Sequence, residues 1–352
     1  MFDGGEYGLP AVAAAALLAA VVSAWLSYQL SRNAIGFLRI VDHPNERSLH
    51  RSPVPRTGGV AVLVAAVLGM SMALLGVDAE PRLGWIAVAV LLVGAVSLLD
   101  DVRDVAQAYR LATHLAAAML ICLGGLQWWH LGLPGIDPRL PFWVACPLSL
   151  LYIVWMINLY NFMDGMDGFA GGMALFGFGA LAVLGWQGGA LTYAALAAVI
   201  AAAAAGFLTR NWPPARIFLG DVGSSVLGLL AAVMTLWGAD LDLFPLWVGW
   251  LIFSPFIVDA TWTLLRRVLA GEPFWRAHRS HHYQRLVLAG WGHRRTLLWA
   301  YVLMAAAAVS GVAAVDKPEH EQWLLLLGWV AIYALVHVRV ELAERAVDAP
   351  AQ

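Results

Sequence analysis

Three aspartates lie together at the end of one apolar stretch of the chain. Asp100 and Asp101 are adjacent, and Asp104 follows within about one helical turn in the sequence SLLDDVRD. Carboxylates at this spacing form a compact anionic face, which suits a hard divalent cation that also binds substrate phosphates. A charged helix end in the lipid headgroup region is the alternative, and three carboxylates so close together favour the cation site over it.

A polar stripe occupies the sequence NLYNFMDGMDG. Asn158, Asn161 and Asp164 are spaced by three residues, so a helix would place them on one face, and Asp167 follows directly. Such a stripe cannot face lipid, because its polar groups would have no hydrogen-bond partners there. It is expected to face a water-filled space or other parts of the protein. Polar contacts between helices are the alternative interpretation.

The sequence RIFLGDVGSS predicts a helix start that binds an anion. Gly220 and the glycine and serines after it would offer free N–H groups and hydroxyls to a phosphate. Asp221 can hold an accompanying metal ion. An ordinary capped helix start would have a similar sequence, so it is the presence of the other polar clusters that favours the phosphate site.

A fourth cluster interleaves histidine with arginine over ten residues. Its members are Arg276, His278, Arg279, His281, His282 and Arg285. These side chains suit a diphosphate, through charge-assisted and bidentate contacts. A zinc site is a rival interpretation, although no cysteine or carboxylate pair completes it. A basic loop attracted to anionic lipids is another.

Two further features each have more than one interpretation. The segment 42–59, which includes Arg51, is too rich in proline and glycine for a helix, but membrane orientation alone would also explain its arginines. Asp259 lies inside an apolar run, about two turns before Arg266 and Arg267. Pairing with these arginines and a role in the site have equal support.

Together the clusters indicate phosphoryl chemistry, because they combine carboxylates for a metal, a phosphate-binding helix start and a His/Arg segment. The chain contains neither a Walker A motif nor a G-x-G-x-x-G motif. ATP-driven transport and dinucleotide chemistry therefore lose support.

The composition places this chemistry in a membrane protein. Of the 352 residues, 61% are hydrophobic and only 12% are charged, whereas a soluble domain carries about 25% charged residues. So little charge cannot cover a water-facing surface, which excludes an ordinary soluble enzyme. The net charge of −2 argues against a nucleic-acid partner. Cys122 and Cys146 lie in apolar stretches and fit no metal or disulfide pattern.

Apolar runs of about 17–25 residues can cross a bilayer as helices. We expect an all-α polytopic membrane protein with eleven such helices, at 9–30, 58–77, 83–99, 111–131, 142–160, 169–186, 189–208, 222–238, 243–265, 296–315 and 322–338. With the N-terminus outside and the C-terminus in the cytoplasm, all 21 Lys and Arg residues except Arg82, Arg139 and Lys317 lie on the cytoplasmic side. One membrane domain is expected to span 1–352. Its active site is expected on the cytoplasmic loops 31–57, 100–110, 159–168, 209–221 and 266–295.

The four motifs DDVRD, NLYNFMDGMDG, RIFLGDVGSS and HRSHHYQ occur in this order on those loops. In this the chain resembles the polyprenyl-phosphate N-acetylhexosamine-1-phosphate transferases of glycosyltransferase family 4, the superfamily that includes phospho-N-acetylmuramoyl-pentapeptide transferase. The resemblance covers nearly the whole chain. The sequence DHPNERSLHRSPVPRTGG is most similar to the branch that initiates O-antigen and other polysaccharides.

The resemblance implies a reaction and its partners. A UDP-N-acetylhexosamine would give its sugar 1-phosphate to undecaprenyl phosphate, releasing UMP, at the inner membrane of a bacterium and with the site facing the cytoplasm. The cofactor would be Mg²⁺, with Mn²⁺ as an alternative. Membrane lipids would surround the enzyme, no nucleic acid would bind it, and a homodimer is left open.

The resemblance also implies roles for particular residues. Asp221, with Asp100, would bind the metal, and Asp100 and Asp101 would lie beside the lipid phosphate. We predict as catalytic residues Asp100, Asp101, Asp164 and Asp167. We predict as substrate-binding residues Asn158, Asn161, Arg51, Arg279, His278, His281, His282 and Gly220. Arg51 stands roughly where the peptidoglycan enzymes carry a lysine.

One departure from the family bears on the substrate. The muramoyl-pentapeptide enzymes have an Asp-Asp-x-x-Lys pattern, and this chain has Asp104 in the last place. That difference counts against a muramoyl-pentapeptide substrate, which is kept as the alternative. The sequence does not name the hexosamine.

The mechanism and the reaction class each have a rival. A lipid phosphate has a second pKa of about 6 and is largely dianionic at neutral pH, so it needs little help from a general base. A direct displacement organised by the aspartates is therefore favoured over a covalent aspartyl-phosphate intermediate.

Two other functions are alternatives. A CDP-alcohol phosphotransferase would also use aspartates and glycines near the inner leaflet, but it leaves the His/Arg segment unexplained. A secondary transporter would carry its polar residues near the bilayer midplane.

Overall fold

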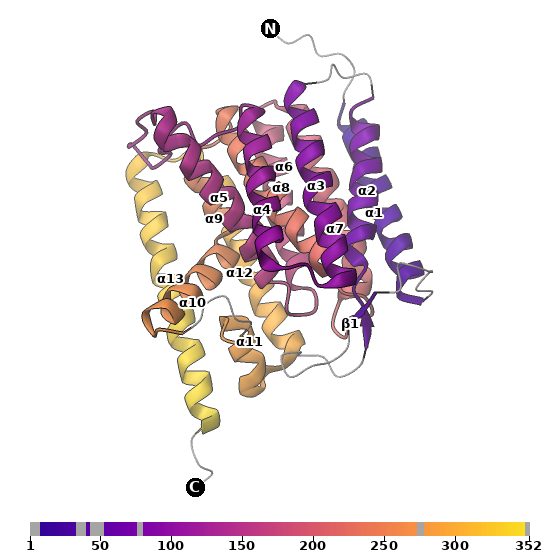
Figure 1. Cartoon of the computed structure of the whole chain (residues 1–352). Helices are drawn as coiled ribbons and strands as arrows, with labels where there is room; N and C mark the ends of the chain where they lie inside the picture. Colours follow the sequence, from indigo (N-terminus) through magenta and orange to yellow (C-terminus); the bar gives the residue numbers. More distant parts are fainter. Residues whose placement is uncertain (1–7, 33–39, 43–52, 76–79, 273–277, 349–352) are drawn as a thin grey trace.

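The computed structural model describes residues 8–32, 40–42, 53–75, 80–272 and 278–348, which form a bundle of long helices (Figure 1). The helices are α1 (Leu9–Arg32), α2 (Gly58–Ala73), α3 (Pro81–Arg103), α4 (Gln107–Leu123), α5 (Phe142–Phe162), α6 (Phe169–Gln187), α7 (Leu191–Asn211), α8 (Gly220–Asp240), α9 (Leu246–Ile252), α10 (Ser254–Leu269), α11 (His282–Leu286), a π-helical turn η2 (Val287–Trp291), α12 (Gly292–Ala314) and α13 (Glu319–Asp348). Two short antiparallel strands, β1 (Val41–Asp42) and β2 (Val54–Pro55), precede α2.

The helices confirm an all-α polytopic membrane protein. Within the described ranges, eight helical segments are long and apolar enough to cross a bilayer, and the bent pair α9–α10 brings the number to nine. Every predicted apolar run overlaps one of these segments or one of the shorter helices α2 and α4, which have 16 and 17 residues. The count of eleven crossings and the orientation of the termini stay predictions.

Helix α8 is the centre of the bundle. It packs against α2, α3, α5, α6 and α9, and its residues from Val222 to Gly238 are all buried. Small residues make this packing close: a Cβ atom on Gly228 would lie 2.5 Å from the carbonyl oxygen of Met156 in α5. Helices α1 and α13 lie at opposite edges of the bundle (Figure 1).

Three predicted segments end or bend where the sequence analysis did not place a break. The run predicted to continue to 131 ends with α4 at Leu123, because Gly125 turns the chain with a φ of +90°. The run predicted at 243–265 is two helices bent by 82°, and Pro255 in the first turn of α10 has no N–H to continue the ladder of α9. Helix α13 continues about ten residues beyond the predicted 338.

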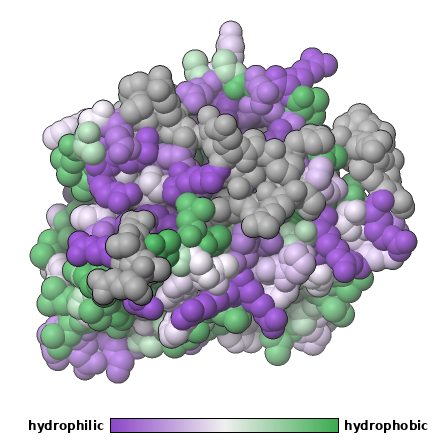
Figure 2. All heavy atoms as spheres, turned by 90° about the horizontal axis from the view of Figure 1, so that it is seen from below, coloured by the Kyte–Doolittle hydropathy of each residue, from purple (hydrophilic) through white to green (hydrophobic). Residues whose placement is uncertain are grey.

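The start of α8 is fixed at one end of the bundle by the segment that leads from β2 into α2. Phe218 donates its N–H to the carbonyl of Pro55 (2.7 Å), Gly58 donates to the carbonyl of Phe218 (2.8 Å) and Gly59 donates to that of Leu219 (2.6 Å). Figure 2 shows this end of the molecule, where hydrophilic residues are interspersed with apolar ones. These hydrogen bonds set the position of the residues that open α8.

The close packing of α5 on α8 gives a test of the fold. Gly228→Ala would force the two backbones apart, so we expect a loss of about 1–3 kcal/mol of unfolding free energy. Thermal unfolding of the purified protein in detergent, followed by tryptophan fluorescence, measures it. Gly84→Ala is the matched control, because no atom lies within 4 Å of the added Cβ there. Equal midpoints for the two variants would contradict the packing.

Candidate active site

Asp101 joins the end of α3 to the start of α8. Its side chain is 1% exposed, and its Oδ1 and Oδ2 atoms accept hydrogen bonds from the N–H groups of Asp221 and Val222, both at 3.3 Å. A carboxylate is favourable there because the N-terminus of a helix carries partial positive charge. Arg56 completes the arrangement: its Nε lies 3.4 Å from Oδ1, and its Nη2 donates to the Asp101 carbonyl at 2.6 Å.

Asp100, the residue before Asp101, contacts the start of α4. Its Oδ1 accepts the N–H of Val105 (2.7 Å), and its Oδ2 lies 2.7 Å from Nη1 of Arg110 in α4. The same Nη1 lies 3.8 Å from Oδ2 of Asp221. Arg110 therefore lies between the two carboxylates that the sequence predicts as metal ligands.

Asn161 and Gly220 place Asp221. Asn161, in the last turn of α5, donates its Nδ2 to Oδ1 of Asp221 (2.9 Å) and to Oγ of Ser224 (3.0 Å). Gly220 has a φ of +73°, and a Cβ there would lie 2.3 Å from the carbonyl oxygen of Arg56. Only glycine fits this position, which lets the chain turn into α8 directly beside Asp101.

The turn between α5 and α6 adds two more carboxylates. Oδ2 of Asp167 accepts the N–H of Ala215 (3.0 Å) and lies 3.6 Å from Nδ1 of His293. Burial raises the pKa of Asp164 well above its usual range, and the neighbouring carboxylates of Asp221, Asp101 and Asp167 raise it further. The ionised form of Asp164 is therefore poorly compensated by the groups around it.

The donor set fits a hard divalent cation that is shared with a substrate. No group of three or more His, Cys, Asp or Glu side chains in the described part of the chain is arranged to hold a metal ion alone. Mg²⁺ does not need one, since it is usually held by one or two carboxylates together with water and phosphate oxygens. Asp221, whose side chain is 29% exposed, and Asp100 would supply such oxygens, and the raised pKa of Asp164 indicates that a cation nearby would be favourable.

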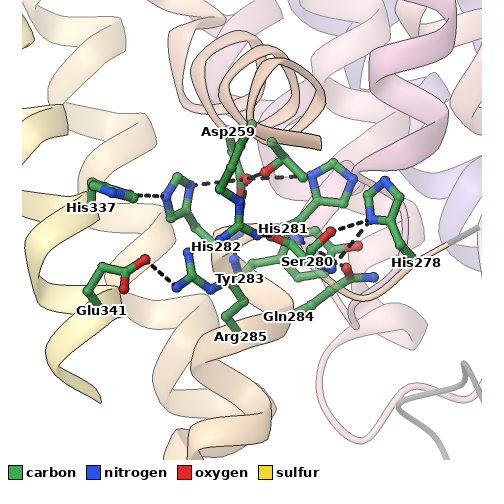
Figure 3. Close-up of polar contacts among 12 residues, drawn as sticks. Asp259, His278, Ser280, His281, His282, Tyr283, Gln284, Arg285, His337 and Glu341 are labelled. Atoms are coloured by element: carbon green, nitrogen blue, oxygen red, sulfur yellow. Dashed lines mark hydrogen bonds and ion pairs between the residues drawn. The ribbon is translucent and has the colours of Figure 1, made fainter. Parts of the chain in front are cut away.

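The histidine segment, residues 278–286, surrounds Asp259 of α10 (Figure 3). Oδ1 of Asp259 accepts the backbone N–H of His282 (2.9 Å) and lies 3.2 Å from its Nδ1 and 3.5 Å from Nδ1 of His281. Oδ2 accepts the N–H of Tyr283 (3.4 Å). One buried carboxylate thus orients the start of α11 and two histidine rings.

Tyr283 connects the histidine segment to the carboxylates. Its hydroxyl donates to the carbonyl of Phe162 (3.3 Å), and a Cβ on Gly165 would lie only 2.2 Å from that hydroxyl. Its ring lies 4.8 Å from the ring of Phe169. The segment therefore packs directly on the turn that carries Asp164.

The sequence model of glycosyl transferase family 4 matches residues 83–239. A probable undecaprenyl-phosphate N-acetylglucosaminyl 1-phosphate transferase of Bacillus subtilis is 31% identical, over 77% of this chain and 76% of its own. The decaprenyl-phosphate N-acetylglucosaminephosphotransferase of Mycolicibacterium smegmatis is 30% identical, over 90% and 86%. The phospho-N-acetylmuramoyl-pentapeptide-transferase of Shouchella clausii is 28% identical, over 74% and 83%.

This chain belongs to glycosyl transferase family 4. It is a transferase, and the resemblance found in its motifs is confirmed. The matched region contains all of the carboxylates described above except Asp259.

The structure of this family 4 transferase brings together most of the predicted site residues. The carboxylate cluster contains Asp100, Asp101, Asn161, Asp164, Asp167, Gly220 and Asp221. Asn158 lies one turn away and is bonded instead to Nδ1 of His114 (3.2 Å) and the carbonyl of Val154 (2.7 Å). Arg51 and Arg276 lie outside the described residues.

The predicted histidines are held within the protein. Nδ1 of His282 faces Asp259 and its Nε2 lies 3.1 Å from Nδ1 of His337, so a substrate would have to displace one of them. His281 is 4% exposed. Burial lowers the pKa of His278 to about 4, so this ring is neutral at pH 7, and its Nδ1 lies 2.8 Å from Oγ of Ser280. Asp259 pairs with His281 and His282 rather than with the arginines that follow it in α10, which was one of its two interpretations.

Sequence reasoning did not single out four residues that hold this site. In the sequence, Arg56 and Arg110 indicated only the orientation of the chain in the membrane. Their carboxylate partners are set by tertiary contacts, which the sequence does not display. Asn211 at the end of α7 accepts the N–H of Gly168 and donates to the carbonyl of Ile217, both at 2.8 Å. His293 beside Asp167 follows the predicted histidine cluster by eight residues and had no motif of its own.

The contrast between Asp101 and Asp164 predicts opposite effects on stability. Asp101→Ala leaves two helix N–H groups and the half-buried Arg56 without their acceptor, so we expect a loss of about 1–3 kcal/mol. Asp164→Asn removes a charge that its neighbours repel, so we expect unchanged or higher stability at pH 7. Because the pKa of Asp164 is raised in the folded protein, ionising this carboxyl group lowers the free energy of unfolding as pH rises above the usual carboxyl range. The unfolding midpoint should therefore fall less steeply with pH in Asp164→Asn than in wild type.

Thermal unfolding in detergent between pH 5 and 8 measures both effects, and Asp316→Asn, an exposed aspartate in the α12–α13 connection, is the control. A destabilised Asp164→Asn variant would contradict the excess of negative charge at the α5–α6 turn.

Proposed function

We propose that this enzyme transfers N-acetylhexosamine 1-phosphate from a UDP-sugar to undecaprenyl phosphate and releases UMP. The observation that carries the proposal is the meeting of Asp100, Asn161 and Asp221 around Arg110 at one end of the bundle. Carboxylates and a guanidinium gathered at the ends of apolar helices suit a reaction between two phosphate groups at a membrane surface. Relatives named for the transfer of N-acetylglucosamine phosphate to polyprenyl phosphates support the substrate class.

The proposal includes the topology predicted from the sequence. Eleven crossings, with the N-terminus outside and the C-terminus in the cytoplasm, place the carboxylate cluster and the histidine segment on the cytoplasmic side of a bacterial inner membrane. Within the described ranges, nine segments are long and apolar enough to cross a bilayer if the bent pair α9–α10 is one of them, and the proposed topology requires α2 and α4 to cross as well. Nucleotide-sugars are cytoplasmic, so this orientation gives the donor access to the site.

The reaction forms one bond and breaks one. An oxygen of the lipid phosphate attacks the β-phosphorus of the UDP-sugar, the bond from that phosphorus to the bridging oxygen breaks, and UMP leaves with the oxygen. Asp221 and Asp100 would hold Mg²⁺, or Mn²⁺, which would neutralise charge on the phosphates. Asp101 positions the start of α8, and Asn161 orients the Asp221 carboxylate.

Direct displacement is favoured over a phosphorylated aspartate by the contacts of the two adjacent aspartates. Both oxygens of Asp101 accept hydrogen bonds from α8, and both oxygens of Asp100 are engaged, one with Val105 and one with Arg110. A carboxylate held in this way is a weak nucleophile, whereas the lipid phosphate dianion is already reactive.

The pathway and the alternative substrate are also proposals. We propose that the product initiates O-antigen or another cell-surface polysaccharide. A muramoyl-pentapeptide substrate is the alternative, and a relative of that name exists. Asp104, which stands at the lysine position of those enzymes, has a φ of 49° and ends α3 as its C-cap, so here it is a turn residue. A CDP-alcohol phosphotransferase is the weaker alternative.

The reaction predicts UMP release that depends on lipid and metal. Purified enzyme in detergent, with undecaprenyl phosphate, Mg²⁺ and a panel of UDP-N-acetylhexosamines and UDP-muramoyl-pentapeptide, should release UMP with one hexosamine donor. Asp221→Asn should lose at least about 100-fold in rate, since it removes a carboxylate that would hold the metal ion neutralising the reacting phosphates. EDTA should abolish release and added Mg²⁺ should restore it. Asp316→Asn, in the α12–α13 connection, should retain full activity.

Two outcomes would count against this result. Release with the pentapeptide donor alone would favour the alternative substrate, and no release with any donor would contradict the proposal.

Direct displacement predicts that no phosphate remains on the enzyme. Incubation with the identified donor, but without undecaprenyl phosphate, should leave the intact mass of the protein unchanged. A sugar-phosphate or phosphate adduct, mapped to Asp100 or Asp101 by peptide mass spectrometry, would establish the covalent mechanism instead.

A further inference from the structure

The second half of α13 contacts the histidine segment through a buried arginine. Nε of Arg285 donates to Oε1 of Glu344 (2.7 Å) and Nη2 donates to Oε1 of Glu341 (2.6 Å) and to Oε2 of Glu344. The Arg285 side chain is only 6% exposed. One guanidinium thus joins the end of α11 to two carboxylates of α13.

A second link runs from α13 to Asp259. Nδ1 of His337 and Nε2 of His282 lie 3.1 Å apart and share a hydrogen bond. The other ring nitrogen of His282, Nδ1, faces Asp259. His337, Glu341 and Glu344 are spaced by four and three residues, so they lie on one face of α13. Figure 3 shows His337 and Glu341 on the side of α13 that is turned to the segment.

The segment lies between α13 and the α5–α6 turn. On one side Tyr283 bonds to Phe162 and packs on Gly165, and on the other side Arg285 and His282 bond to α13. Helix α13 contacts α11, η2 and α12 and is otherwise largely exposed along its length. The face of α13 that carries His337, Glu341 and Glu344 is therefore directed at the histidine segment.

We propose that the face of α13 formed by His337, Glu341 and Glu344 is a positioning element of the active site. It fixes the histidine segment against the turn that carries Asp164 and thereby sets the affinity for the nucleotide-sugar. This inference rests on the proposed function for its kinetic consequence, and on the contacts alone for its structural one. The three residues touch no reacting atom and act through Arg285, His282 and Tyr283.

The test combines hydrogen exchange with kinetics. The double variant Glu341→Gln, Glu344→Gln leaves the buried Arg285 without a charged partner, whereas Glu341→Gln alone leaves it the two contacts to Glu344. Glu321→Gln is the matched control, because Glu321 lies near the other end of α13 and pairs with Lys317 at the surface (3.5 Å). Hydrogen–deuterium exchange of peptides spanning 278–286, and KM and kcat for the donor, are measured in detergent for each variant.

We expect faster exchange over 278–286 in the double variant, a smaller effect in the single variant and none in the control. Exchange in α5 and α8 should not change, which separates loosening of the segment from global unfolding. The KM for the donor should rise about tenfold, or about 1.4 kcal/mol of binding free energy, with kcat changed by less than about twofold. A merely structural contact would loosen the segment without this division between KM and kcat.

Two results would overturn the inference: unchanged exchange over 278–286 in the double variant, or faster exchange with an unchanged KM. A wild-type enzyme that transfers no sugar phosphate would refute the proposed function, while the exchange comparison would still decide whether α13 holds the segment.

Discussion

The hydrogen bonds from the first turn of α8 to the Asp101 carboxylate are the contact on which the rest of the site depends. A buried charge in a membrane protein is costly, and here two helix N–H groups and Arg56 offset part of that cost. The same contact fixes where α8, the most buried helix, begins. Because Asp221 is the second residue of that helix, its carboxylate is placed by Asp101 before any substrate binds.

The site keeps more negative charge than it compensates. Arg56 and Arg110 offset part of the charge on Asp101, Asp100 and Asp221, and the pKa of Asp164 is raised by burial and by three neighbouring carboxylates. A protein selected for stability alone would not retain such a group. A divalent cation bound with substrate phosphates, as in the proposed reaction, would relieve this repulsion.

Much of the fold could be predicted from the sequence, because apolar length and turn glycines act locally. The junction of α6 and α7 is an example, since Gln187 and Gly188 separate two apolar runs. The gathering of the aspartates followed from topology, because their loops share one side. Their partners could not be predicted: Arg110 looks like any orientation signal, and the pairing of Asp259 with His282 requires the bend between α9 and α10. The stripe at 158–164 predicted one face, yet only its second residue reaches Asp221, because Asn158 lies one turn deeper beside His114.

The two halves of the site are held by different helices. The ends of α3, α4, α5 and α8 position the carboxylates, whereas α10 and α13 position the histidine segment, and Tyr283 against the α5–α6 turn joins the halves. His282 has both ring nitrogens engaged within the protein, so its contribution is to orient its neighbours rather than to supply a free donor. The proposed reaction would bring together a membrane-bound phosphate and a soluble nucleotide-sugar, which are substrates from different phases. Because different helices hold the two halves, the histidine segment could vary without disturbing the carboxylates.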